Sequence, residues 1–84
     1  MVIAIASTET SSGITQEQYD KVRTGMTLSQ VREIMGSNGQ KVVELEILGT
    51  KAITYQWNGK ELLSYAQVVF TNGKVSSKIA SGLK

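Results

Sequence analysis

The strongest constraint on the fold is a helix-start signal that occurs twice in the first half of the chain. Thr15 precedes Gln18, and Thr27 precedes Gln30, at the spacing of a capping box. In such a box the threonine hydroxyl accepts a hydrogen bond from an amide of the first turn, and the glutamine reaches back to the amide of the cap. We therefore expect one helix to begin near Gln16 and a second to follow Thr27.

The two helices are expected to meet at an elbow made of Gly25, Met26 and Thr27. Gly25 can take the left-handed conformation in which many helices end, and Met26 would anchor the elbow on the core. The second helix is expected to stop at Gly36. Its apolar residues recur at helical spacing and are Leu28, Val31, Ile34 and Met35. Short helices are marginal in isolation, so this pair needs a sheet to lie on.

From Lys41 onward the apolar period changes to two, which predicts strands. Three turn signals divide the strands: a short loop at 48–50, and Asn-Gly pairs at 58–59 and 72–73. Strands that follow one another through short turns form an antiparallel meander. We therefore predict an α+β fold, in which two short N-terminal helices pack on one face of a four-stranded antiparallel meander sheet.

The turns also predict which side chains lie under the helices. We expect Ile47 to pair with Lys51 and Thr71 with Lys74, so that the apolar residues of neighbouring strands share one face. The residues expected on this helix-covered face are Val43, Leu45, Ile47, Ile53, Tyr55, Trp57, Ser64, Ala66, Val68, Phe70, Val75, Ser77 and Ile79. Those expected on the open face are Val42, Glu44, Glu46, Ala52, Thr54, Gln56, Leu63, Tyr65, Gln67, Val69, Lys74, Ser76 and Lys78.

The open face has the mixed character of a recognition surface, because apolar and aromatic residues stand among polar ones. The candidate partner-binding residues are Gln56, Leu63, Tyr65, Gln67 and Val69. An ordinary half-polar sheet face would have the same composition. Both interpretations are open at this point.

The composition argues against catalysis. The chain has no cysteine and no histidine, which removes thiolate and imidazole chemistry and the commonest metal ligands. Glu44 and Glu46 share a strand face, but no third oxygen ligand or matching acid accompanies them, and Ser77 and Lys78 point to opposite sides of a strand. The 9 basic residues are scattered, which does not favour nucleic-acid binding. We expect no enzyme activity, no catalytic or metal site and no cofactor.

The N-terminus is expected to lie outside the folded domain. Residues 1–13 are interpreted as a flexible leader or linker, and residues 14–84 as a single domain. The apolar start, Met1 to Ala6, is too short for the core of a signal peptide, and the Ser/Thr/Gly tract after it cannot bury enough surface to order itself. No stretch reaches the roughly 20 apolar residues that a transmembrane helix needs.

The elbow and the second helix, residues 25–36, read GMTxxxVxxIxG, and a Tyr-x-Trp strand and an Asn-Gly-Lys-Val turn follow. This pattern resembles the repeat unit of the β-lactamase inhibitory protein (BLIP) superfamily. The small outer-membrane-assembly lipoproteins of the BamE/SmpA type are similar over the same helices. The runs TYQW and VSSKIASGLK are most similar to single-domain, lipoprotein-type members of Gram-positive bacteria, and the resemblance covers about residues 14–84.

The resemblance implies a cell-envelope or secreted domain that binds another protein. In the inhibitory protein, two tandem copies join and their concave sheet faces grip an enzyme; this chain has one copy and lacks the cysteines of that protein. Family members often carry a lipidated cysteine upstream, and such an anchor is absent from this chain. The leading hypothesis is therefore a non-enzymatic interaction module of the envelope or the extracellular space, which uses its open sheet face. The alternatives are a structural or sensory envelope domain that forms a homodimer, and an inhibitor of an envelope enzyme such as a β-lactamase.

Overall fold

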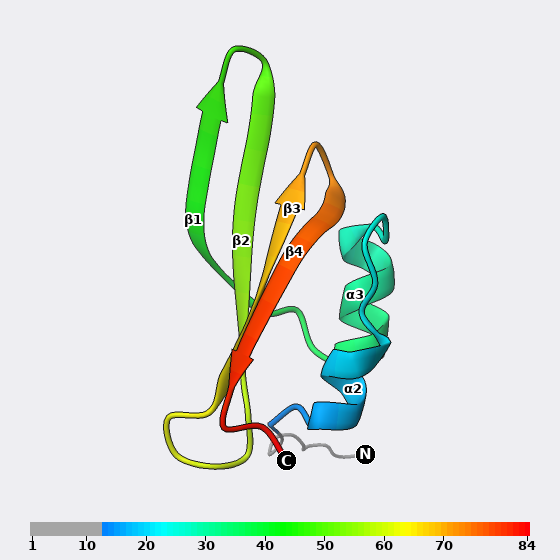
Figure 1. The fold of residues 1–84 in the computed structure, drawn as a ribbon, viewed down its shortest axis with the longest axis vertical. Coiled ribbons are helices and arrows are strands. Elements are labelled where there is room, and N and C mark those ends of the chain that lie inside the picture. The colour runs from blue at the N-terminus through cyan, green and yellow to red at the C-terminus, as the bar shows by residue number, and fades with distance from the viewer. Residues whose placement is uncertain (1–12) are drawn as a thin grey trace, which may run out of the picture.

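The computed structural model describes residues 13–84. Helices α2 (Gln16–Lys21) and α3 (Leu28–Met35) precede four strands. The strands are β1 (Gln40–Ile47), β2 (Thr50–Asn58), β3 (Tyr65–Thr71) and β4 (Lys74–Ser81). They form one antiparallel sheet in the order β1-β2-β3-β4, and both helices lie on the same side of it (Figure 1). The predicted α+β meander is confirmed, whereas the leader predicted at 1–13 lies outside the described residues except for Gly13.

Both helices begin where the capping boxes predict. Thr15 Oγ1 accepts from the amide of Gln18 at 3.1 Å, and the amide of Thr15 donates to Gln18 Oε1 at 2.8 Å. Thr27 and Gln30 make the same reciprocal pair at 3.2 and 2.9 Å. Helix α3 ends at Gly36, which is left-handed with a φ of 76°. Two orphan amides of each helix start are thus satisfied by side chains.

Helix α2 ends earlier than the sequence indicates. It stops at Lys21, and Val22 is already extended and buried. Gly25 is left-handed as expected, with a φ of 94°, but it belongs to the elbow and not to the helix end. The elbow pairs with β4: the amide of Gly25 donates to Val75 O at 2.9 Å, and the amide of Val75 donates to Met26 O at 2.8 Å. These two backbone bonds explain why the chain leaves the helix early.

The core lies between the helices and the part of the sheet formed by the end of β2, by β3 and by the start of β4. Its buried members are Ile14, Val22, Val31, Met35, Trp57, Ala66, Val68, Phe70 and Val75. Trp57 donates its indole N–H to Ser37 O at 3.0 Å, so this large side chain is buried with its polar atom satisfied. The predicted face of β2 and β3 is confirmed, since Trp57 is opposite Ala66 and Tyr55 opposite Val68.

The predicted register of β1 is wrong by one residue. Ile47 pairs with Thr50 and not with Lys51, because the loop is a two-residue turn formed by Leu48 and Gly49. Leu48 takes a left-handed φ of 52°, which leucine disfavours by about 1–2 kcal/mol and which the sequence therefore did not suggest. A one-residue slip moves every side chain of a strand to the other face. As a result Val43, Leu45 and Ile47 lie on the open face, and Glu44 and Glu46 on the side of the helices.

The predicted register of β4 holds only next to its turn. Thr71 pairs with Lys74 and Phe70 with Val75 as expected, but a bulge follows, and Val68 is opposite Lys78 and not Ser77. Ile79 therefore lies opposite Gln67 on the open face, and not in the core. In the bulge the Ser76 hydroxyl donates to Val69 O at 3.3 Å and accepts from Thr71 Oγ1 at 2.8 Å. These bonds replace part of the interrupted ladder.

The bulge turns Lys78 toward the helices. Its ammonium lies 4.2 Å from the centre of the Tyr19 ring and donates to Tyr19 O at 2.9 Å. Burial raises the pKa of the Tyr19 hydroxyl, and the carboxylate of Asp20 adds to the rise. The expectation that Lys78 lies on the open face is therefore wrong.

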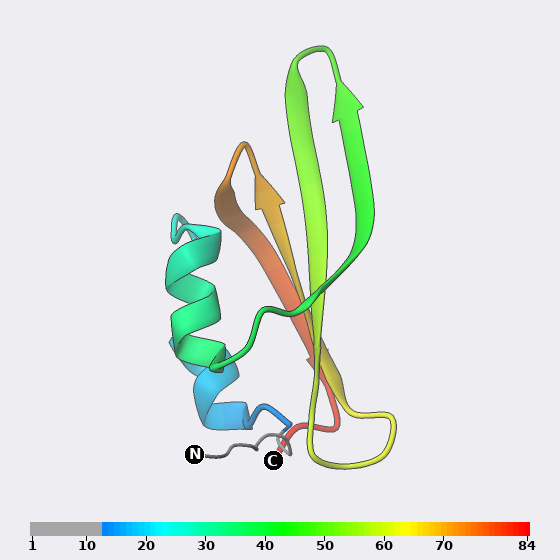
Figure 2. The ribbon, with the colours of Figure 1, turned by 180° about the vertical axis from the view of Figure 1, so that it is seen from behind.

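The β1–β2 hairpin projects beyond the rest of the molecule. Its turn rises past the β3–β4 turn and past the end of α3 (Figures 1 and 2). All 8 residues of β1 are exposed as a consequence. Between residues 13 and 84 there is no helix long and apolar enough to cross a membrane.

Candidate functional site

The open face of the sheet carries apolar residues at its margins and amides at its centre. Both helices lie on the other face, so no helix of the described chain covers this one (Figures 1 and 2). The ladder pairs place the following side chains on it: Val43, Leu45, Ile47, Ala52, Thr54, Gln56, Tyr65, Gln67, Val69, Ser77 and Ile79. It is a surface suited to contact with a protein, since apolar groups are interleaved with hydrogen-bonding ones.

Four of the five predicted site residues come together on this face. Gln56 and Gln67 are direct cross-strand partners, and Gln67 Nε2 donates to Gln56 Oε1 at 2.9 Å. Gln56 Nε2 in turn donates to Asn58 Oδ1 at 3.1 Å. Tyr65 and Val69 flank Gln67 on the same side of β3. The hydrogen bonds hold the amides in fixed positions, which lowers the entropy lost when a partner binds.

Leu63, the fifth, is not in a strand. It lies in the loop 59–64, has a left-handed φ of 66° and is 86% exposed. Three bonds close the loop: the amide of Gly59 donates to Ser64 O at 2.9 Å, and the amide and hydroxyl of Ser64 both donate to Glu61 O, at 3.1 and 2.6 Å. The loop is longer than the Asn-Gly signal predicts, but it swings to the side opposite the helices (Figures 1 and 2). Leu63 therefore still borders the open face.

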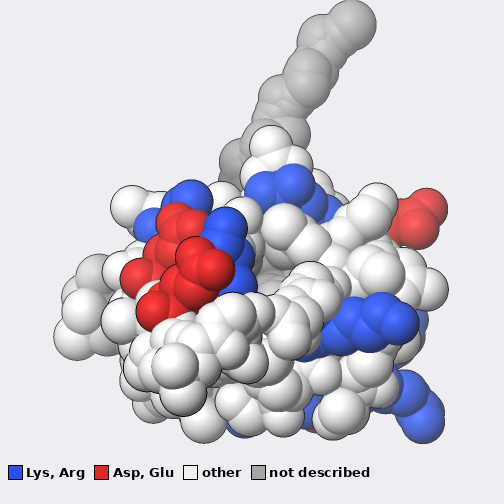
Figure 3. Space-filling view, turned by 90° about the horizontal axis from the view of Figure 1, so that it is seen from above, with Lys and Arg blue, Asp and Glu red and all other residues white. Residues whose placement is uncertain are grey.

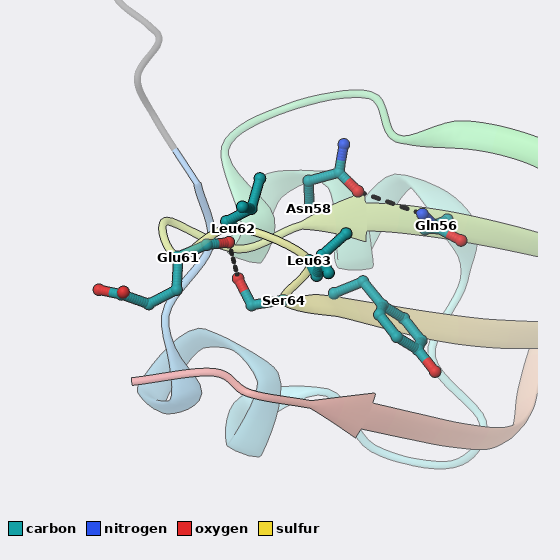
Figure 4. Close-up of a pocket in the computed structure, with 7 residues that line it drawn as sticks. Gln56, Asn58, Glu61, Leu62, Leu63 and Ser64 are labelled. Atoms are coloured by element: carbon teal, nitrogen blue, oxygen red, sulfur yellow. Dashed lines mark hydrogen bonds between the residues drawn. The ribbon is translucent and has the colours of Figure 1, made fainter.

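A hollow of about 590 Å³ lies between this loop and the ends of β2 and β3. It is lined by Gln56, Asn58, Glu61, Leu62, Leu63, Ser64 and Tyr65. The Glu61 carboxylate points away from Gln56 and Asn58, so the wall that they form presents neutral groups (Figure 4). Exposed leucines beside oriented amides are suited to holding a side chain of a partner. Nothing in the hollow supplies a nucleophile with a base beside it.

Sequence reasoning missed the apolar margins of this face. Val43, Leu45 and Ile79 are 45%, 56% and 56% exposed there, although all three were expected in the core. For β1 a signal was available, because Gly49 can serve as the second residue of a two-residue turn. Such a turn moves every side chain of β1 to the opposite face of the sheet. For Ile79 the bulge at Ser76 left no pattern in the sequence that we can identify.

The other face of the β1–β2 hairpin is charged. Glu44 lies 3.0 Å from Lys41 Nζ and 3.3 Å from Lys51 Nζ. The hydrogen bonds from these two lysines hold the pKa of Glu44 below its ordinary value, and the bond to Glu44 raises the pKa of Lys41. Figure 3 shows a compact acidic cluster with basic side chains beside it. Within residues 13–84, no three potential metal ligands gather at any point.

A comparison with known families agrees with this architecture. The family model described as "Beta-lactamase inhibitor (BLIP)" matches residues 15–84, which include both helices and all four strands. No curated protein matches the chain, and no solved structure does. The match begins at the cap of α2 and ends at the last residue, so it leaves out only Gly13 and Ile14 of the described residues. The chain therefore belongs to the β-lactamase inhibitor (BLIP) family.

Proposed function

We propose that this protein is a non-enzymatic interaction domain that binds a protein partner on the open face of its sheet. The observation that carries the proposal is the sheet face that neither described helix covers. On it Val43, Leu45 and Ile79 leave apolar surface in water, around the hydrogen-bonded pair of Gln56 and Gln67. Removing apolar surface from water is favourable by about 25 cal/mol per Å², and the fixed amides give direction to the contact.

Within this face, we assign partner contact to Gln56, Leu63, Tyr65, Gln67 and Val69. Tyrosine brings a large, rigid side chain with a polar end, and such residues are enriched among those that dominate binding energies. Tyr65 and Leu63 both border the hollow at the loop. They are suited to enclosing one side chain of the partner, while the glutamines pair with its polar groups.

We further propose that the domain works in the cell envelope or outside the cell. The support is the resemblance of residues 14–84 to single-domain, lipoprotein-type members and, over the helices, to the BamE/SmpA type. The given sequence contains no cysteine, so a lipid anchor would be attached to a cysteine outside it. Contact with the membrane would come only through that anchor, and contact with the partner through the sheet.

A second candidate function is inhibition of an enzyme. The family description names a β-lactamase inhibitor, and this favours an envelope enzyme such as a β-lactamase as the partner. Inhibition by a single domain requires that one sheet face alone cover the entrance to the active site. In the alternative of a homodimer, the sheet faces of two copies would together be available to cover that entrance.

The experiment is capture of partners from envelope and culture-medium fractions of the source cells by the immobilised full chain. A captured protein is then purified and titrated against the wild type, against Tyr65→Ala/Gln67→Ala, and against Glu33→Ala on the exposed side of α3. We expect the double variant to bind at least about 30-fold more weakly, as for residues that dominate an interface. The Glu33 variant should bind as the wild type does.

The same variants test the inhibitor function with a panel of purified β-lactamases and a chromogenic substrate. Inhibition through the open face would be supported if the wild type slowed hydrolysis of the substrate and the double variant did not. If every variant captured and inhibited equally, the partner would not use this face, and the proposed function would be wrong.

A further inference from the structure

We infer that the partner contributes an extended segment that pairs with the free edge of β1, with apolar side chains on the open face and basic side chains on the other. The inference rests on the proposed function and deepens it, because it states the chemistry of the partner and how its backbone is bound. It concerns the edge of the sheet and not the face.

The two edges of the sheet differ. The start of the β4 edge, at Lys74 and Val75, is occupied by the elbow, through the bonds of Val75 to Gly25 and Met26 and a bridge between Thr27 and Lys74. Among residues 13–84, β1 has a neighbour only on its β2 side, and all 8 of its residues are exposed. A free edge presents a row of unpaired amides and carbonyls, which is a template for another strand.

The turn shows which backbone groups of β1 point outward. Leu48 and Gly49 have φ values of 52° and 82°, and Ile47 is opposite Thr50, as in a type I′ hairpin. The residues that flank such a turn exchange hydrogen bonds, and along the strand bonded and non-bonded pairs alternate. The amides and carbonyls of Glu44 and Glu46 therefore point away from β2, toward an incoming strand.

The side chains specify what that strand carries. Val43, Leu45 and Ile47 form an exposed apolar row on the open face, and Glu44 and Glu46 form an acidic row on the other, where Lys41 and Lys51 contact Glu44. A strand beside β1 meets both rows, because its own side chains alternate between the faces. Apolar residues on one side and lysine or arginine on the other satisfy the two rows at once.

The acidic row disfavours a second copy as the occupant. Antiparallel pairing of two β1 strands centred on Leu45 would match Val43 with Ile47, but it would also set Glu44 opposite Glu46 twice. Like charges directly opposite each other are destabilising. Glu44 already has two lysine partners, whereas Glu46 has no ion pair among residues 13–84. A partner strand with basic side chains avoids the repulsion between glutamates that pairing of two copies would create.

The test uses a labelled peptide, Lys-Val-Lys-Val-Lys-Ile-Lys, titrated against the full chain by fluorescence anisotropy. In the inferred pairing the lysine residues are opposite Glu44 and Glu46, so their amides bond to β1 while the valine amides point away. We expect N-methylation of the central lysines to weaken binding at least about tenfold, since two or more backbone bonds are lost. N-methylation of the valines, with the same side chains and added methyl groups, should leave the affinity unchanged.

Two protein variants make the matching test of charge. Glu46→Lys should weaken binding of the peptide at least about tenfold, and Glu33→Lys, with the same change in net charge on α3, should have little effect. In NMR spectra the amides of Glu44 and Glu46 should exchange more slowly when the peptide is bound.

Several outcomes would overturn the inference. They are absence of peptide binding, equal affinity of both methylated peptides, protection of amides outside β1, and a dimer of the free chain that already protects Glu44 and Glu46. The captured partner separates this inference from the proposed function. If Tyr65→Ala/Gln67→Ala releases that partner but Glu46→Lys does not, the edge inference fails and the face proposal stands; if neither variant releases it, the face proposal fails.

Discussion

The β1–β2 and β3–β4 hairpins have the same turn geometry and opposite surroundings. Leu48 and Gly49 close the first with φ values of 52° and 82°, and Asn72 and Gly73 close the second with 50° and 87°. Along β3 every second residue is buried, whereas no residue of β1 is. The second hairpin lies under the helices, and the first extends past them (Figure 1).

The turn residues reflect this difference. Asn72 tolerates the left-handed conformation and ties its turn to β2, because Lys51 N donates to Asn72 Oδ1 at 3.0 Å and Asn72 N donates to Lys51 O at 2.8 Å. Leu48 is strained in the same conformation and is 99% exposed. The β3–β4 hairpin thus stabilises the domain, while the β1–β2 hairpin exposes apolar surface to water, which lowers the stability of the fold. This is the pattern expected where stability is given up for binding.

The largest effect should come from removing the same two methyl groups on each hairpin. Val68→Ala on β3 should lower the free energy of unfolding by about 2–3 kcal/mol, because Val68 is fully buried and a cavity remains. Val43→Ala on β1 should change it by less than about 0.5 kcal/mol. Urea unfolding followed by Trp57 fluorescence measures both. Equal losses would show that β1 belongs to the core, contrary to its exposure.

Exchanging the two turn residues should have a smaller effect, of opposite sign in the two hairpins. Leu48→Asn should stabilise the protein by about 1 kcal/mol, since the left-handed strain is relieved. Asn72→Leu should destabilise it by about 1–2 kcal/mol, since strain is introduced and the bond from Lys51 N is lost. Thermal unfolding of both variants and of the double exchange gives the values. If Leu48→Asn were destabilising, Leu48 would make a contact that its exposure does not indicate.

The smallest effect concerns the charges on the projecting hairpin. The hydrogen bonds from Lys41 and Lys51 lower the pKa of Glu44 from its ordinary value of 4.5. A carboxylate whose pKa is lower in the folded state adds stability above its unfolded pKa, and that stability is lost as the pH falls through the folded pKa. Titration of the Glu44 carboxyl by carbon NMR should therefore show a low pKa that rises toward 4.5 in Lys41→Met/Lys51→Met. An unchanged pKa in that variant would mean that the lysines are too mobile in solution to act on Glu44.

Much of the fold was predictable because the signals are local. A capping box specifies both helix starts within a few residues, and both lie where expected. The Asn-Gly pair at 72–73 and the alternation around it place Phe70 opposite Val75. The predicted core faces of β2 and β3 are correct although the loop between them is longer than predicted. The predicted and observed loop lengths differ by an even number of residues, so the same side chains share a face.

The errors in strand register have two causes, and neither can be read from the local sequence pattern. A leucine in a left-handed turn contradicts its own propensity, so the shorter turn and the reversed faces of β1 were not predicted. A bulge adds one residue to β4 and sends Ile79 to the open face and Lys78 to the helices. For the site, the pairing of Gln56 with Gln67 follows from the predicted parity, but the placement of Leu63 in a loop does not.

By itself, the sequence determined the order of the elements, the two helix starts at their capping boxes, the core faces of β2 and β3 and the α+β class of the fold. Each of these depends on residues near one another in the chain, whose hydrogen bonds and periodicity act locally. Only the tertiary structure decided which side of β1 meets solvent, where β4 bulges and which edge of the sheet pairs with the elbow. Those features depend on how far the helices extend over the sheet and on the elbow pairing with Val75. They form only when all elements pack together. Strain at one residue persists where packing of the whole fold lowers the free energy by more than that strain raises it.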